Sequence, residues 1–192
     1  MRPTLSPEQI HHFWFVEAAG YSGFDRPGGF LNIWFERNRL FDMAVRDRLG
    51  PAFFRARPDG IKNWQDTPLG GLARILLFDQ VPRNVLRGRA SAFATDAQAR
   101  ETAYHMLRWG YDQELGRMER LFCYMPFQHS EDLEDQDLAV ELYDALGFAK
   151  EYAEAHRDVI EKFGRFPHRN AALGRESTAA EIEYINTPGT GF

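Results

Sequence analysis

The sequence predicts an all-α fold. Its 21 Ala residues outnumber its 13 Val and Ile residues together, and strict alternation of apolar and polar residues is nearly absent. Helices favour Ala whereas strands favour β-branched residues, so this composition argues against a sheet. Pro and Gly residues then divide the chain into segments of ordinary helix length. With 192 residues and no shift in composition, we expect one domain over residues 1–192.

Start and stop signals define the first four predicted helices. A Ser cap followed by Pro starts the first, over residues 7–20, and a Gly ends it. The second, over 34–49, stops at a Gly-Pro pair. An Asp-Thr-Pro signal starts the third at residue 67, and it is apolar on nearly every side, which predicts a buried central helix. We expect it to stop at or before Pro82, because a proline keeps the preceding residue out of helical geometry. The fourth, over 95–109, has a Thr-Asp start and a Gly stop.

Four more helices complete a predicted set of about eight. The fifth covers residues 113–124 and should stop at Pro126. The sixth and seventh cover 130–146 and 148–163, and the eighth covers 177–185. The short loops between them predict that successive helices pack antiparallel. The pattern around the sixth and seventh helices weakly resembles a tetratricopeptide helix pair, so a helical superhelix and a closed bundle both remain open at this point.

Composition and charge exclude several functions. The chain has 23 Lys and Arg against 28 Asp and Glu, a net charge of -5, so we expect no nucleic-acid partner. One cysteine, Cys123, allows no intramolecular disulfide and suits a reducing compartment. No apolar run approaches the roughly 20 residues that span a membrane, so we expect a cytoplasmic protein with no membrane partner. No Gly-rich phosphate-binding or dinucleotide motif occurs, so we expect no cofactor.

Several unusual strings occur together in this chain. They are FWF at 13–15, WF at 34–35, LLFDQVPRNVLRG at 76–88, AFATDAQA at 92–99, ERLFCYMPFQHSEDLEDQ at 119–136 and AHRDVIEKFGRFPHRNAALGRESTAAEIEYI at 155–185. Together they resemble the bacterial family known as domain of unknown function 924, over almost the whole chain. The resemblance implies an all-α fold with a tetratricopeptide-like, right-handed array of antiparallel helices. It implies no activity and no catalytic residue, because none is established for that family.

Asp79 is the first candidate for a functional site. It follows the most apolar helix, where a carboxylate faces the negative end of the helix dipole and, if buried, must be paired or protonated. The segments 78–84 and 163–170 both place Arg-Asn shortly after a proline. We interpret them as two helix-ending corners that face each other and bring Arg83, Arg165 and Arg169 around Asp79.

These arginines have two open interpretations. They form an ion-pair network that locks helix ends, or their guanidinium groups bind the carboxylate or phosphate of a ligand. The second interpretation makes the chain a binding protein for a small anionic ligand or the acidic end of a peptide, which is the leading functional hypothesis. The candidate ligand-binding residues are Asp79, Gln80, Arg83, Asn84, His129, Glu131, His156, Arg165, His168, Arg169 and Asn170.

A hydrolase-like enzyme is the alternative hypothesis. His129, Glu131 and His156 would act as acid and base, or would hold a divalent metal together with His168. The sequence has no local His-x-x-x-His ligand pair, so we predict no metal site. His156 lies on an apolar helix face, which is more typical of a hydrogen-bonded core residue. A third possibility is a scaffold for a partner protein, which would expose a sizeable apolar patch.

Overall fold

The structure, a computed structural model, describes residues 5–22, 29–56 and 58–188. Over these ranges the chain forms eleven α-helices and no β-strand, which confirms the predicted all-α class. The helices are α1 (Pro7–Phe15), α2 (Arg39–Arg48), α3 (Gly50–Arg55), α4 (Pro68–Ile75), α5 (Val81–Val85), α6 (Asp96–Trp109), α7 (Arg117–Gln128), α8 (Leu133–Leu146), α9 (Lys150–Phe163), α10 (Asn170–Leu173) and α11 (Ala179–Asn186). Short 3-10 segments join them: η1 (Glu17–Tyr21), η2 (Asn32–Trp34), η3 (Pro58–Asp66), η5 (Ala90–Ala92), η6 (Tyr111–Glu114) and η7 (Pro167–Arg169). A π-helical turn, η4 (Leu76–Gln80), connects α4 to α5.

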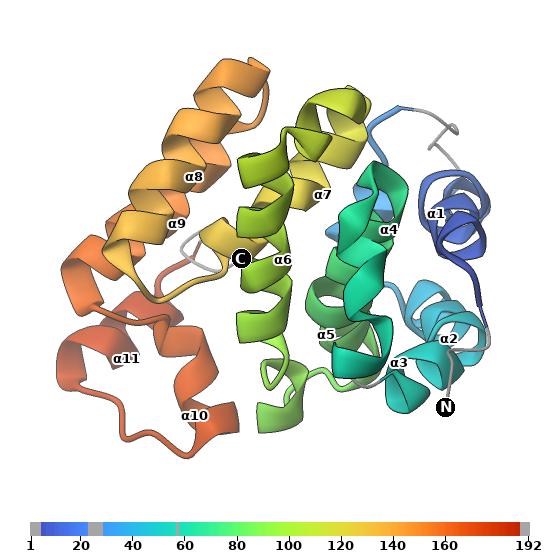
Figure 1. Cartoon of the computed structure of the whole chain (residues 1–192). Helices are drawn as coiled ribbons and strands as arrows, with labels where there is room; N and C mark the ends of the chain where they lie inside the picture. Colours follow the sequence, from blue (N-terminus) through green and yellow to red (C-terminus); the bar gives the residue numbers. More distant parts are fainter. Residues whose placement is uncertain (1–4, 23–28, 57, 189–192) are drawn as a thin grey trace.

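The helices follow one another across the molecule (Figure 1). The α1, α2 and α3 helices lie at one end, α8 and α9 lie side by side at the other, and α4, α6 and α7 lie between them. From α6 onward each long helix packs against the next, α6 on α7, α7 on α8 and α8 on α9. The tetratricopeptide-like, right-handed winding of this array stays a prediction. Among the described residues no helix is both long and apolar enough to cross a bilayer.

An aromatic core joins the N-terminal helices to α7. Trp14 of α1 meets Phe122 of α7 edge-on, with ring centroids 5.6 Å apart, and also contacts Phe41 of α2. All three rings are fully buried. A separate, smaller apolar cluster contains Ile160 of α9 and Phe166, which anchors the segment before η7. The two clusters thus fix α7 and the C-terminal turn, the elements that carry the site described below.

The predicted third helix does not stop at Pro82. The chain passes from α4 through the π-helical turn η4 into α5, which runs to Val85. Pro82 has no N–H to donate to the carbonyl of Phe78, four residues earlier, and the hydroxyl of Thr95 donates to that carbonyl instead at 2.6 Å. The helix tolerates the proline because a residue from the start of α6 replaces the missing hydrogen bond.

Two other predicted boundaries also differ. The α7 helix continues through the buried Pro126 to Gln128. The second predicted helix begins at Arg39 and not at residue 34, because the side chain of Asn38 caps it by accepting the backbone N–H groups of the next turn. The α3 helix follows the predicted stop of the second helix, α5 follows the π-helical turn, and α10 was not expected, so the count of helices over the described residues exceeds eight.

Candidate functional site

Asp79 is completely buried in the π-helical turn η4. Nδ1 of His129 lies 2.8 Å and 3.0 Å from the two carboxylate oxygens, and Nη1 of Arg83 lies 3.1 Å from Oδ1. Gln80 Nε2 donates to Oδ2 at 2.5 Å. Burial alone would raise the pKa of Asp79, but the charge of Arg83 and the hydrogen bonds from His129 and Gln80 outweigh it and lower the pKa. The carboxylate is therefore ionised at neutral pH. Single π turns occur frequently at functional sites.

His129, the residue that ends α7, directs its two ring nitrogens differently. Nδ1 faces an ionised carboxylate that can only accept, so Nδ1 carries the proton and donates it to Asp79. Nε2 makes no hydrogen bond with any residue that the structure describes, and the side chain is 16% exposed, so Nε2 is open to solvent. Burial and the positive charge of Arg83 hold the pKa of His129 below its ordinary 6.5. The imidazole is thus neutral at pH 7, with an accessible lone pair on Nε2.

Arg83 connects Asp79 to Asp96, the first residue of α6. Its Nη1 and Nη2 donate to the two oxygens of Asp96 at 2.8 Å and 2.9 Å, a bidentate ion pair. Nη1 also donates to the backbone carbonyl of Asp79 at 2.6 Å. Both Arg83 and Asp96 side chains are about one fifth exposed, at 18% and 22%. One guanidinium group therefore ties the π-helical turn to the start of α6.

Arg169, in η7, closes the arrangement. Its guanidinium lies between the rings of Phe93 and Phe166, 4.7 Å and 4.6 Å from their centroids. Nη2 donates to the backbone carbonyl of His129 at 2.9 Å, and Nη1 lies 3.4 Å from Oδ2 of Asp96. Burial, and next the like charge of Arg83, lower the pKa of Arg169 to about 10, so it stays protonated at neutral pH.

These contacts form a closed ring that we call the His129 circuit. Its members, in order of contact, are His129, Asp79, Arg83, Asp96 and Arg169. Two carboxylates balance two guanidinium groups, and the imidazole is neutral, so the circuit carries no net charge. The members come from η4, α5, α6, the end of α7 and η7, and the circuit therefore joins five elements between residues 79 and 169.

The residues after His129 fix the loop that leads to α8. Ser130 donates its hydroxyl to Asp135 at 2.5 Å and accepts from Arg100 at 2.9 Å. Glu131 forms a bidentate ion pair with Arg175, at 2.7 Å and 2.9 Å. Ser130 is thus engaged with Asp135 and is not placed as a nucleophile for His129.

Two of the other candidate residues face different partners. Asn84 donates to Asp42 at 2.8 Å, on the α2 side of α5. Arg165 forms a bidentate ion pair with Glu181 of α11, so the prediction that it surrounds Asp79 is wrong. The two corners do not face each other as we interpreted them: Arg169 reaches the circuit, whereas Arg165, four residues earlier, turns toward α11.

The remaining candidates lie beside the circuit or away from it. His156 Nδ1 lies 2.7 Å from the carbonyl of Tyr152, and Gln128 contacts the same ring, as expected of a hydrogen-bonded core histidine. Its ring centroid is 6.4 Å from that of His129. Asn170 donates to Ser177 at 3.0 Å, and His168 is exposed.

The proposed metal ligands do not assemble. Glu131 is held by Arg175, and His156 by the Tyr152 carbonyl. Over the ranges that the structure describes, no group of three His, Cys, Asp or Glu side chains is arranged to hold a metal ion. The metal version of the hydrolase hypothesis therefore has no support in the donor geometry.

Sequence reasoning missed Asp96 and Phe93. The pair Thr95-Asp96 was interpreted only as a helix start, yet Thr95 makes no capping bond and Asp96 binds both arginines of the circuit. The signal available in the sequence was charge balance, because two buried arginines require a second carboxylate besides Asp79.

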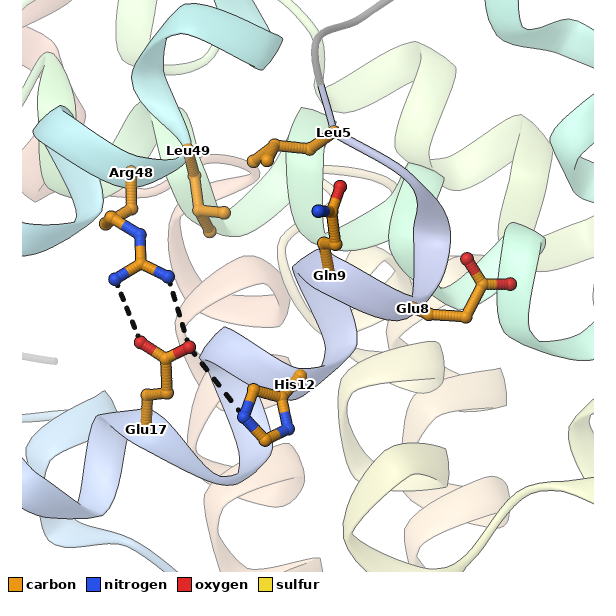
Figure 2. Close-up of a pocket in the computed structure, with 7 residues that line it drawn as sticks. All are labelled: Leu5, Glu8, Gln9, His12, Glu17, Arg48 and Leu49. Atoms are coloured by element: carbon orange, nitrogen blue, oxygen red, sulfur yellow. Dashed lines mark hydrogen bonds and ion pairs between the residues drawn. The ribbon is translucent and has the colours of Figure 1, made fainter.

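Two surface hollows lie away from the circuit. Figure 2 shows one of about 340 Å³ between α1 and α2, where Arg48 donates to both oxygens of Glu17 and His12 lies 3.8 Å from the same carboxylate. It is lined by Leu5, Glu8, Gln9, His12, Glu17, Arg48 and Leu49. The second, of about 480 Å³, is lined by Lys162, Phe163, Arg165, Thr178, Ala180 and Glu181. No member of the circuit lines either hollow.

Comparison with known proteins identifies the family. A solved structure described as a protein of unknown function, ATU0120 from Agrobacterium tumefaciens, is 39% identical to this chain and superposes with a TM-score of 0.81. The match covers 94% of this chain and 96% of that one. No curated protein matches the sequence. The family model described as "Bacterial protein of unknown function (DUF924)" matches residues 10–189. The chain therefore belongs to the DUF924 family.

Proposed function

We propose that this protein is a hydrolase-type enzyme in which His129 acts as the general base. The observation that carries this proposal is the state of the imidazole: neutral, with Nδ1–H bound to a buried carboxylate and Nε2 open to solvent. An imidazole oriented in this way by a carboxylate is the arrangement that activates a hydroxyl or a water for attack.

The chemistry follows from the two ring nitrogens. Nε2 removes a proton from a water molecule as its oxygen attacks an electrophilic carbon or phosphorus. The imidazole then carries a positive charge, which the ionised Asp79 stabilises through the Nδ1–H bond. The same proton is afterwards available for the leaving group. Asp79 is a suitable partner because its pKa is lowered and it remains ionised throughout.

Binding of an anion, our leading hypothesis from the sequence, has less support. Arg83 has both of its terminal nitrogens on Asp96, and Arg169 lies near the same carboxylate. Because the circuit has no net charge, an incoming anion would have to displace Asp96 before it gained a guanidinium partner. The geometry therefore favours proton transfer at His129 over capture of an anion by the arginines.

Hydrolysis of a panel of esters, amides and phosphoesters tests the proposal. We expect His129→Gln to lower the rate on any substrate of the wild-type protein by about 10²–10⁴-fold, the usual contribution of a general base. The matched control is His12→Gln, because His12 is 60% exposed and lies outside the circuit. Equal rates for the wild-type and His129→Gln proteins on every substrate would refute the proposal.

A further inference from the structure

We propose that Arg169 is a positioning residue, which holds the backbone of His129 so that the imidazole keeps its bond to Asp79 and presents Nε2 outward. This inference rests on the proposed function, since it concerns the same histidine. It concerns how the base is oriented, and it assigns the task to a residue 40 positions later in the chain, which hydrogen-bonds the backbone carbonyl of His129.

His129 is held at both of its ends. The ring is fixed through Nδ1 on Asp79, and the main chain is fixed through its carbonyl on Nη2 of Arg169. His129 is the last residue before the chain leaves α7, and its carbonyl points beyond the helix end, where no helical N–H group follows to bind it. Without Arg169 the main chain that carries the ring would lose its charged hydrogen bond, and the ring would leave Asp79 for part of the time.

The shape of an arginine suits this position. Its flat guanidinium lies between Phe93 and Phe166 and directs two nitrogens to two targets, the His129 carbonyl and Asp96. Lys would keep the positive charge, but an ammonium group neither stacks between two rings nor offers a planar fork. Arg169→Lys therefore keeps the positive charge and removes the planar guanidinium, so it tests the geometry of this residue apart from its charge.

Stability alone does not account for Arg169. The residue is only 6% exposed, it lies near a second guanidinium, and its Nε is buried without a hydrogen-bond partner among the described residues. Each of these features costs folding free energy, and the contact with Asp96 is long at 3.4 Å. Arg169 lowers folding stability in these ways and contacts the backbone of His129, so its role is better explained by orientation of His129.

Arg165 provides a matched control in the same loop. It donates to both oxygens of Glu181 and to the carbonyl of Glu176, so it also combines a carboxylate with a backbone carbonyl. It makes none of its hydrogen bonds with the circuit. Arg165→Lys thus changes the C-terminal segment without altering what holds His129.

The test is the tautomer of His129, measured by ¹H–¹⁵N NMR of the imidazole nitrogens at about pH 8, where the ring is neutral. In the wild-type protein we expect the Nδ1–H form. In Arg169→Lys we expect the ratio of the Nδ1–H to the Nε2–H form to fall by about tenfold or more, the effect of losing one charged hydrogen bond. Arg165→Lys should leave the ratio unchanged.

A second variant guards against misfolding. Asp96→Asn removes the charge that orients Arg169 and keeps the size of the side chain, so it should shift the same ratio in the same direction. The inference would be overturned if Arg169→Lys and Asp96→Asn both folded, kept the wild-type ratio of His129 tautomers, and lowered the melting temperature as Arg165→Lys does. Arg169 would then be a structural residue. This readout needs no substrate, so its outcome is separate from the hydrolysis test: a failed panel with a shifted tautomer would reject catalysis and retain the positioning role.

Discussion

Asp79→Asn is the sharpest test of the buried carboxylate. The side chain is completely buried, accepts from His129 and Gln80, and forms an ion pair with Arg83. In the Asn variant one oxygen can still accept from His129, but the ion pair with Arg83 is lost and the new amide group meets the amide nitrogen of Gln80, donor against donor. Breaking a buried ion pair costs about 3–5 kcal/mol. Because Arg83 keeps both of its bonds to Asp96, we expect the low end, about 3 kcal/mol of unfolding free energy.

Urea unfolding of the wild-type and Asp79→Asn proteins from neutral to acid pH measures this loss. The pKa of Asp79 is lower in the folded protein than in the unfolded chain, so its stabilisation is complete above the unfolded pKa and is lost as pH falls through the folded pKa. The difference between the two proteins should therefore stay constant from about pH 8 to about pH 5 and shrink only in strong acid. The control is Asp42→Asn, which breaks a partly exposed pair with Arg87, keeps an oxygen that accepts from Asn84, and should cost about 0–1 kcal/mol. A loss below about 1 kcal/mol for Asp79→Asn at neutral pH would refute the reasoning.

Two further predictions concern the base and the proline. For a substrate of the panel, kcat/KM should rise with pH through the pKa of His129, which lies below 6.5, and should be level around neutrality. If kcat/KM instead fell as pH rose through that region, the protonated imidazole would be the active form. Thr95→Val removes the hydroxyl that satisfies the Phe78 carbonyl and should cost about 1–3 kcal/mol of unfolding free energy. Thr95→Ser keeps the hydroxyl and should lower the unfolding free energy clearly less. If both variants lost the same free energy in chemical denaturation, the hydrogen bond to the Phe78 carbonyl would not be what stabilises the helix at Pro82.

The sequence predicted most helix starts because the caps are local. Ser6, Thr67, Asp132 and Thr178 accept backbone N–H groups of the helices that follow them, as their residue types indicate. The course of the chain at Pro82 could not be predicted in this way. The hydrogen bond that compensates for this proline comes from Thr95, and nothing in the local sequence specifies that contact.

The sequence predicted the candidate site only in part, because residue type is local whereas the packing of the loops is not. Asp79, Arg83 and His129 stand out by residue type and lie together, as does Arg169. Arg165 looked equivalent to Arg169, but Gly164 adopts a left-handed conformation at the end of α9 and the chain then enters η7, so side chains four residues apart face different partners. Which arginine enters the circuit depends on that turn, and no periodicity in the sequence specifies it.

The closing contact of the circuit has a consequence for biosynthesis. When His129 has been added to the growing chain, every other member of the His129 circuit has been made except Arg169, which follows 40 residues later. Until Arg169 is made, the backbone carbonyl of His129 lacks its charged hydrogen bond. The proposed activity would therefore reach its full level only after the segment that carries η7 has been made and has docked, and we expect fragments that end before η7 to be less active.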